Sequence, residues 1–387
     1  MSEFRPASAY IHIPFCVRKC AYCDFLSFAD KEAHACMDDY VEALCREIRM
    51  TPEWFGKGDV LKTVYFGGGT PSLLSPSRIG KIIYVLTEVF GISEDAEITL
   101  EANPGTIDQV KLEGFRVMGI NRLSIGIQSL DDGVLRTLGR IHDASAARSA
   151  VEDAARAGFQ NLSCDMMLGI PGQTMDSVKE TLSFFLEKKI PHVSLYSLIL
   201  EEGTPLFSRY GGDIEKYVSQ EEDRTMYHLV TSTLRGHGYV HYEISNMALP
   251  GYESRHNSMY WRAEPYYAFG VGAHYYLGSE RGRHVETLSG YIEAMRRTEV
   301  KKEDVLVEEE RLSDEDQRKE YMMLSFRTRS GVGEQEFRER FTMDVGSAFR
   351  EELEREIAAG LVAYEEGRYR LTEKGVDLAN QVFMDYV

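Results

Sequence analysis

The stretch that decides the fold lies near the start of the chain and reads Phe15-Cys16-Val17-Arg18-Lys19-Cys20-Ala21-Tyr22-Cys23. Three cysteines grouped so closely indicate metal binding rather than a disulfide framework. The run follows a β-rich segment at residues 9–13, so it forms a loop at the end of a strand. A [4Fe-4S] cluster takes four ligands, normally cysteine thiolates. Three protein ligands therefore leave one iron open for a substrate.

Structural zinc is the alternative for this loop. A structural zinc site is closed and four-coordinate. The nearby candidates for a fourth ligand are Asp24, His12 and His34. The remaining cysteines lie in helical or strand patterns, and we expect small core side chains there; they are Cys36, Cys45 and Cys164.

Composition narrows the class of protein. The 387 residues are 43% hydrophobic and 27% charged, which is typical of a globular protein with more than one domain. The net charge of −18 argues against a nucleic-acid partner, which requires a basic surface. No apolar run is long enough to span a membrane. Residues 1–6 do not resemble a secretory signal, so we expect a cytoplasmic protein.

Short β-rich runs alternate with amphipathic helical patterns up to about residue 200. The expected strands are residues 9–13, 62–66, 97–101, 122–126, 162–167 and 193–198. The clearest helical patterns are residues 37–50, 77–90, 144–157 and 175–188. This alternation predicts an α/β fold with a parallel sheet. Six units rather than eight predict an open, partial (β/α)6 barrel.

Distinctive short motifs follow the expected strands, where the sites of such barrels lie. The second strand runs into Gly67-Gly68-Gly69-Thr70-Pro71, and the third ends in Glu101-Ala102-Asn103-Pro104. Gln128 follows the fourth strand and Asp165 lies in the fifth. Taken singly, the glycines fit a tight turn, and Glu101 or Asp165 fits a helix N-cap. Their repetition at successive strand ends favours one shared site.

The ordered set of motifs resembles the radical SAM superfamily, whose members bind S-adenosylmethionine (SAM) at a [4Fe-4S] cluster. More narrowly, the chain resembles the oxygen-independent coproporphyrinogen III oxidase group over essentially its whole length. Besides the cysteine loop and the Gly67–Pro71 run, the motifs that carry this resemblance are Tyr10-Ile11-His12-Ile13-Pro14-Phe15-Cys16, Glu101-Ala102-Asn103-Pro104, Ser124-Ile125-Gly126-Ile127-Gln128-Ser129, Arg140-Ile141-His142 and Gly169-Ile170-Pro171-Gly172-Gln173.

The resemblance implies a role for each site residue. Cys16, Cys20 and Cys23 bind three irons, and SAM chelates the fourth. Gly68, Gly69 and Thr70 let the backbone approach the methionine amino group, because glycine lacks a Cβ. The side chains implied to contact the carboxylate, amine and ribose of SAM are Glu101, Gln128, Arg140 and Asp165. The rings implied to line the cluster and the adenine or sulfonium are Tyr10 and Tyr22.

Two branches of the group differ at recognisable positions. The oxidases carry a fourth cysteine two residues after the third, where this chain has Phe25. The heme chaperones called HemW share the three-cysteine loop and a His-Asn-x-x-Tyr-Trp signature, which here is His256-Asn257-Ser258-Met259-Tyr260-Trp261. The chain therefore resembles the chaperones, which implies heme binding and delivery to an apo-hemoprotein client. The resemblance leaves open a homodimer and peripheral association with a membrane.

Two other activities remain as alternatives. One is decarboxylation of the coproporphyrinogen III propionates to give protoporphyrinogen IX. The other is a different radical SAM reaction on a tetrapyrrole. Phe25 and the His256 signature favour the chaperone over both.

His256 has a chemical rationale as a heme ligand. Neutral imidazole is a standard axial ligand of heme iron. Tyr260, Trp261, Tyr266 and Tyr267 can pack on a flat ring. We expect His256 on an accessible loop beyond the barrel. The alternative is a structural histidine that fixes the position of that loop.

The chain divides into three expected regions: a radical SAM core at residues 1–205, an extension with the His256 signature at 206–300, and a C-terminal region at 301–387. A helical pattern covers residues 219–235. The acidic residues 299–310 are expected to be an exposed connection. The C-terminal region combines three helical patterns with a hairpin around Glu366-Gly367, which predicts a small α+β module like a winged helix.

Overall fold

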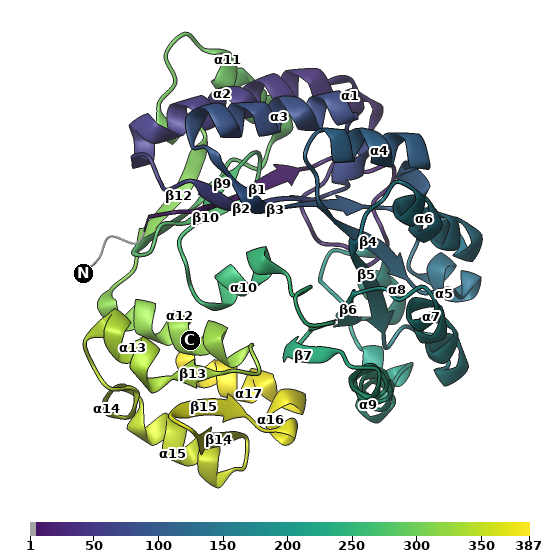
Figure 1. Cartoon of the computed structure of the whole chain (residues 1–387), viewed down its shortest axis with the longest axis vertical. Helices are drawn as coiled ribbons and strands as arrows, with labels where there is room; N and C mark the ends of the chain where they lie inside the picture. Colours follow the sequence, from purple (N-terminus) through teal and green to yellow (C-terminus); the bar gives the residue numbers. More distant parts are fainter. Residues whose placement is uncertain (1–4) are drawn as a thin grey trace.

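The computed structural model describes residues 5–387, and at its centre is a curved nine-stranded sheet (Figure 1). Six parallel strands follow one another in chain order, which confirms the predicted partial barrel. They are β1 (Ser8–Ile13), β2 (Leu61–Gly68), β3 (Ile92–Ala102), β4 (Arg122–Gln128), β5 (Asn161–Leu168) and β6 (His192–Ser197). Residues 1–4, part of the segment used to argue against a secretory signal, lie outside the described range.

The helices between these strands lie on the outer face of the sheet (Figure 1). They are α1 (Lys31–Ala35), α2 (Met37–Phe55), α3 (Pro76–Val89), α4 (Gln109–Val117), α5 (Asp132–Thr137), α6 (Ala144–Arg156) and α7 (Met175–Glu187). Side-chain oxygens cap the N-termini of the five helices from α3 to α7. They thereby satisfy backbone N–H groups that lack a partner within the helix. The four strongest helical patterns in the sequence correspond to α2, α3, α6 and α7.

The two faces of the sheet differ sharply in chemistry. One row of paired residues across five strands is apolar and joins the core beneath the helices; it consists of Ile11, Phe66, Leu100, Leu123 and Leu162. The adjacent row, which faces the opposite way, consists of Tyr10, Tyr65, Thr99, Arg122 and Asn161. A parallel sheet covered on both faces is normally apolar throughout. The polar inner face therefore indicates an interior built to hold polar ligands.

The extension (residues 206–300) completes the same sheet at both edges. β9 (Tyr267–Phe269) pairs in parallel with β1, and β8 (Asn246–Ala248) pairs antiparallel with β6 and with β7 (Val240–Glu243). α8 (Pro205–Tyr210) and α9 (Gln220–Gly236) precede these strands. The predicted helix at 219–235 is thereby confirmed. The strands were not predicted, because runs of three or four residues carry no measurable periodicity.

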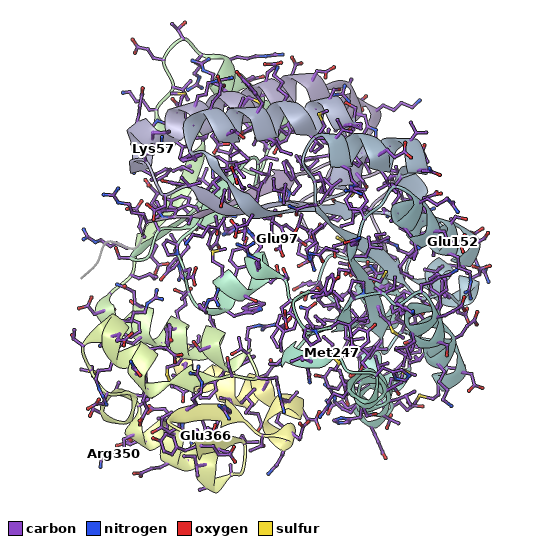
Figure 2. All side chains as sticks on the ribbon, viewed as in Figure 1. Lys57, Glu97, Glu152, Met247, Arg350 and Glu366 are labelled. Atoms are coloured by element: carbon purple, nitrogen blue, oxygen red, sulfur yellow. The ribbon has the colours of Figure 1, made fainter. Side chains whose placement is uncertain are left out.

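Inside the curve of the sheet lies α10 (Arg255–Trp261), from the extension (Figure 1). The buried carboxylate of Glu97 on β3, labelled in Figure 2, accepts hydrogen bonds from the backbone nitrogens of Arg255 at 3.1 Å and His256 at 3.0 Å. The hydroxyl of Ser254 caps the same helix by accepting from the nitrogen of Asn257. The core therefore fixes the start of α10 from the sheet side.

A second, three-stranded sheet follows, formed by β10 (His274–Tyr276), β11 (Glu280–His284) and β12 (Leu306–Arg311), with α11 (Leu288–Arg296) between the last two. The expectation that residues 299–310 form only a connection is wrong, because residues 306–310 belong to β12. The acidic side chains of this edge strand pair with arginines on β11, Glu308 with Arg283 and Glu310 with Arg281. Cross-strand pairing thus explains the acidic composition.

The C-terminal module has the predicted α+β composition. Its helices are α12 (Asp314–Phe326), α13 (Glu334–Phe341), α14 (Val345–Ala348), α15 (Arg350–Ala358), α16 (Glu373–Asp377) and α17 (Ala379–Phe383). Its strands are β13 (Val332–Gly333), β14 (Val362–Glu365) and β15 (Arg368–Leu371). Glu366 and Gly367 form the two-residue hairpin turn, and both have positive φ, as in a type I′ turn.

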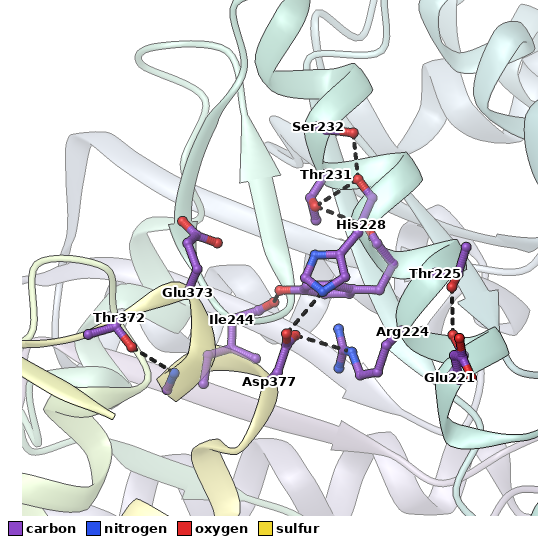
Figure 3. A network of polar contacts seen from close by, with 12 residues as sticks. Glu221, Arg224, Thr225, His228, Thr231, Ser232, Ile244, Thr372, Glu373 and Asp377 are labelled. Carbon is purple, nitrogen blue, oxygen red and sulfur yellow. Dashed lines mark hydrogen bonds and ion pairs between the residues drawn. The ribbon is translucent and has the colours of Figure 1, made fainter. Parts of the chain in front are cut away.

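Polar contacts join this module to the barrel through α9 (Figure 3). Asp377 on α16 accepts from Nε2 of His228 at 3.0 Å, and its carboxylate lies 3.3 Å from Nε of Arg224. Because these three side chains are only partly exposed, the contacts are less screened than a fully solvated pair. The module is therefore positioned against the extension as well as against its own core.

Candidate functional site

The cysteine loop leaves β1 and is tied to the chain on two sides. The backbone nitrogen of Cys16 donates to the carbonyl of Phe28 at 2.9 Å, which joins the beginning of the loop to the segment that follows it. Ala21 donates to the carbonyl of Leu138 at 2.9 Å, at the end of α5. The guanidinium of Arg18 donates to the carbonyls of Gly139 and Arg140. The loop is thereby held at the C-terminal edge of the sheet, where the barrel architecture places a site.

The three thiols of this loop are free and half-buried. Burial raises the pKa of Cys23 to about 11, and the neighbouring Cys20 and Cys16 add to the rise, so the sulfurs lie near one another. Nη1 of Arg140 donates to the sulfur of Cys20 at 3.4 Å, and the hydroxyl of Thr70 lies 3.5 Å from the sulfur of Cys16. A cation and a hydroxyl beside thiols favour the thiolates that bind iron. The donor set fits a cluster with three cysteine ligands.

Within residues 5–387, no group of three or more Cys, His, Asp or Glu side chains converges closely enough to hold a single metal ion. A cubane makes a different demand, since each of three irons takes one thiolate. Of the other cysteines, Cys45 and Cys164 are buried, as predicted for core side chains, and Cys36 is half-buried at the junction of α1 and α2.

The glycine run after β2 packs directly on the cysteine loop. Gly69 donates to the carbonyl of Ile13 and Thr70 to that of Phe15, at 2.9 and 2.8 Å. A Cβ on Gly69 would lie 2.8 Å from the oxygen of Phe15, and Gly68 has a φ of +107°. Only glycine satisfies both conditions. The run therefore does more than turn the chain, because it places backbone that no side chain covers next to the cysteine loop.

Three of the four predicted polar contacts of SAM lie on the successive strands β3, β4 and β5, namely Glu101, Gln128 and Asp165, and the fourth, Arg140, lies in the loop after α5. Glu101 accepts from the hydroxyl of Tyr65 at 2.7 Å, and Asp165 accepts from the hydroxyl of Ser124 at 3.2 Å. Neither caps a helix, so that alternative is wrong for both. Arg140 donates to the carbonyl of Gly126 at 2.7 Å.

Two atoms of this group are buried without a hydrogen-bond partner in the described chain, Oε1 of Gln128 and Nε of Arg140. Gln128 also has a left-handed backbone, with φ of +66°, which is rare outside glycine and indicates strain. Unpaired buried polar atoms are costly unless a ligand or water satisfies them. Both atoms are therefore available to a polar ligand beside the cysteine loop.

Burial dominates the electrostatics of the inner face. It raises the pKa of Glu101 to about 7, although the hydroxyl of Tyr65 acts in the opposite direction, and the neighbouring Asp165 raises it further. Burial also raises the pKa of Asp165, against the hydroxyls of Ser194 and Ser124. The carboxyl of Glu101 therefore changes charge near neutral pH, which suits it to respond to a cationic ligand.

The two predicted tyrosines flank this site. The hydroxyl of Tyr10 lies 3.1 Å from Nδ1 of His12, and its ring stacks on that of Tyr65 at 6.3 Å. Tyr22 lies in the cysteine loop, and burial raises its pKa, as do the nearby thiols of Cys20 and Cys23. The structure thus brings all the predicted cluster and SAM residues to one edge of the barrel.

Sequence reasoning missed Arg122, at the start of β4. It is one of the largest fully buried side chains, and its Nε has no hydrogen-bond partner in the described chain. Its charge acts on Glu101 and Asp165, and it helps to lower the pKa of His256 after burial. The signal that reveals it is an arginine at the start of a strand that carries no other charged residue.

The expectation that His256 lies on an accessible loop is wrong. His256 belongs to α10, is fully buried, and stacks on the ring of Tyr65 at 5.1 Å. Its Nδ1 lies 2.7 Å from the hydroxyl of Thr63, and its Nε2 lies 2.8 Å from the hydroxyl of Tyr260. Both ring nitrogens are therefore engaged. The reason is that the extension turns back into the barrel instead of leaving it.

Comparison with known proteins identifies the family. The sequence pattern of the Radical SAM superfamily matches residues 10–185, and that of the HemN C-terminal domain matches residues 312–378. The heme chaperone HemW of Lactococcus lactis is 35% identical over 99% of this chain and 98% of its own. The heme chaperone HemW of Bacillus subtilis is 36% identical over 97% and 98%. The chain belongs to the HemW family of radical SAM proteins. A [4Fe-4S] cluster and SAM are the cofactors that membership in the superfamily implies.

The fold of the family is also that of a solved structure. Coproporphyrinogen III oxidase (HemN) from Escherichia coli superposes with a TM-score of 0.83 over 99% of this chain and 90% of its own, at 23% sequence identity. At that identity the likeness establishes the fold alone. In the described part of this family member, none of the helices is both long and apolar enough to cross a bilayer.

Proposed function

We propose that this protein is a heme chaperone, which binds heme and delivers it to an apo-hemoprotein. The observation that supports this is family membership across nearly the whole chain, together with Phe25 where a fourth cysteine would stand. The side chain at this position is therefore an apolar ring, 65% exposed, and not a thiol. A carrier need not supply the additional chemistry of an enzyme that turns over a porphyrinogen.

The cofactor assignments belong to the same proposal. Cys16, Cys20 and Cys23 hold three irons of the cluster, which in its reduced form supplies the electron for radical chemistry when SAM is bound. Gly68, Gly69 and Thr70 present backbone to the amino group of SAM. Polar partners for its carboxylate, amine and ribose come from Glu101, Gln128, Arg140 and Asp165, and the flanking rings are Tyr10 and Tyr22.

These residues act as a binding site before any chemistry takes place. Arg140, which contacts Cys20, is positioned to pair with an anionic group beside the cluster. An ionised Glu101 is positioned to accept from a cationic amine, and Tyr65 orients that carboxylate. A cytoplasmic location, an apo-hemoprotein client and a homodimer remain predictions.

The experiment compares, under anaerobic conditions, the binding and transfer of heme with the conversion of coproporphyrinogen III. We expect purified protein to bind about one heme per chain and to transfer it to an apo-hemoprotein. We expect no protoporphyrinogen when coproporphyrinogen III, SAM and a reductant are supplied. Phe25→Cys is the matched variant, since it adds the missing thiol alone, and heme binding should not change. If wild type converts coproporphyrinogen III and does not bind heme, the chaperone proposal is wrong and the protein is an oxidase.

A further inference from the structure

His256, which we first expected to ligate heme, is closed to heme iron in this structure. Its two ring nitrogens contact Thr63 and Tyr260, and its ring is fully buried against Tyr65. A metal ligand must present a free nitrogen lone pair. Ligation by His256 would require both contacts to be rearranged within a packed interior. The structure therefore raises the question of which imidazole is accessible.

A cavity of about 370 Å3 begins at the C-terminal end of the same signature. This volume lies at the lower end of the range typical of small-molecule sites. Five aromatic residues line it, so we call it the aromatic cavity; they are Tyr260, Trp261, Tyr266, Tyr275 and Tyr276. Tyr260 connects this wall to the interior, because its hydroxyl contacts His256 and its ring packs on Tyr266 at 4.6 Å. Two residues of the signature thus line the cavity while its histidine supports the wall from behind.

Trp261 contributes an unsatisfied donor to this wall. Its Nε1 is buried and has no hydrogen-bond partner in the described chain. The guanidinium of Arg327 lies 4.5 Å from the ring centroid and so covers one part of the indole. A buried donor without a partner is unfavourable unless a ligand or water accepts from it.

His274, on β10, offers the accessible imidazole that the buried His256 does not. It lines the aromatic cavity, its side chain is exposed, and among residues 5–387 no hydrogen bond or ion pair is found for its ring. Although much of the residue is exposed, the part of the ring that the protein covers loses solvation, which lowers its pKa, and the nearby Arg283 lowers it further, so the imidazole stays neutral at physiological pH. A neutral, accessible imidazole beside flat aromatic walls is the combination that binds a metallated planar ring.

The charges of the cavity indicate how such a ring is held. Arg281 and Arg283 line it, but each pairs with a glutamate on β12, and Arg281 also pairs with Glu320 on α12. The lining carboxylates outnumber them; these are Glu264, Glu308, Glu310 and Glu320. Propionates therefore find no unpaired cation here. Retention depends on the iron ligand and on contact with the ring, which suits a carrier that must release its cargo.

We propose that the aromatic cavity is the heme site of this protein and that His274 is the axial ligand of the heme iron. The inference rests on the proposed chaperone function and deepens it, by assigning the cargo to a place and a ligand. His256 is then a positioning residue, which holds Tyr260 in the cavity wall. The propionates extend from the mouth of the cavity into solvent.

The test uses hemin and metal-free protoporphyrin IX as probes on the full-length protein. We expect His274→Ala to weaken hemin binding by about tenfold or more and to shift the Soret band. The same change should leave protoporphyrin binding within about twofold, because no iron is ligated. Added imidazole should restore the wild-type Soret position in His274→Ala. His237→Ala, which removes an exposed imidazole outside the cavity, is the matched control and should bind hemin as wild type does.

The outcomes separate this inference from the proposed function. If His274→Ala binds hemin with the affinity and spectrum of wild type, the ligand assignment is overturned while the chaperone stands. If His256→Ala loses the axial-ligand signature and His274→Ala keeps it, the interior histidine is the ligand and the cavity is not the site. If wild type binds no hemin, both proposals fail. Cluster iron content in each variant shows whether the barrel has folded.

Discussion

At the scale of one residue, burial in the barrel interior raises the pKa of the Glu101 carboxyl. This carboxyl lies on the polar face of the sheet beside Asp165, with Tyr65 as its hydrogen-bond donor. The pKa of about 7 lies above the ordinary value of 4.5. The folded protein therefore retains a proton that the unfolded chain has released. Stability contributed by this group is full below about pH 4.5 and is lost as pH rises to about 7.

We predict that Glu101→Gln reduces this loss. Between pH 5 and pH 8 the free energy of unfolding of cluster-free wild type should fall by about 2–3 kcal/mol more than that of the variant. Urea unfolding at the two pH values measures the difference. Asp165, whose pKa burial also raises, accounts for the pH dependence that remains in the variant. Glu88→Gln, at an exposed position, is the control and should behave like wild type; an equal slope in Glu101→Gln would contradict the assignment.

A second prediction at this scale concerns the cluster ligands. Cys20→Ala should lower reconstituted iron from about four per chain to nearly none, because the cubane loses one of only three protein ligands. Cys36→Ala should retain full iron loading, since Cys36 lies at a helix junction outside the loop. Iron and sulfide analysis under anaerobic conditions measures both. Equal loss in the two variants would refute the ligand set.

At the scale of elements, α10 depends on the sheet that surrounds it. Its first two backbone N–H groups donate to the two oxygens of Glu97, which is 5% exposed on β3. The helix has seven residues, too few to be stable alone. The Glu97 carboxylate is therefore one of the main contacts that fix α10, and with it His256 and Tyr260, against the sheet.

Glu97→Ala should destabilise the protein by about 2–4 kcal/mol, because it leaves two buried N–H groups without acceptors. Denaturant unfolding measures this loss. Fluorescence of Trp261, at the end of α10, should change in the native state before global unfolding. Glu94→Ala, at an exposed position of the same strand, should stay within about 0.5 kcal/mol of wild type. No difference between the two variants would show that other contacts hold α10.

The sequence contained enough information for the parallel core but not for the elements inside and beside it. The strands β1–β6 were predicted because each is a recognisable β-rich run followed by a helix, and the cysteine loop was predicted from spacing alone. β7, β8 and β9 are too short to carry a pattern, and their partners are far away in the chain. The burial of His256 depends on those pairings, which no local signal specifies. Glu97 was missed because its partners on α10 lie more than a hundred positions away in the chain, and Arg122 because the carboxylates on which its charge acts lie on the neighbouring strands β3 and β5.

At the scale of the whole molecule, one buried carboxylate joins the barrel helices to the extension. Glu47 on α2 contacts Nε2 of His284 on β11, accepts from the hydroxyl of Tyr291 on α11, and accepts from the nitrogen of Gly270 at 3.0 Å. Burial lowers the pKa of His284, but Glu47 more than offsets it, so the pKa is raised. The pair is almost completely buried, at 2% exposure for each side chain.

Glu47→Ala should cost about 3–5 kcal/mol, the usual effect of removing one partner of a buried ion pair. The damage should spread to the extension, so hydrogen exchange should accelerate in β9 and β11 together. Glu42→Ala, on the same helix but at an exposed ion pair with Lys81, should cost less than about 1 kcal/mol. If the two variants were equally stable, the extension would not depend on Glu47.

The pairing of β1 with β9 has a consequence for biosynthesis. Ala9 lies opposite Tyr267, so about 250 residues are translated between the two halves of this ladder. At ribosomal speeds of 5–20 residues per second, the outer edge of β1 waits about 10–50 s for its partner. During that interval the strand that leads into the cysteine loop exposes unpaired backbone, a template for misassociation.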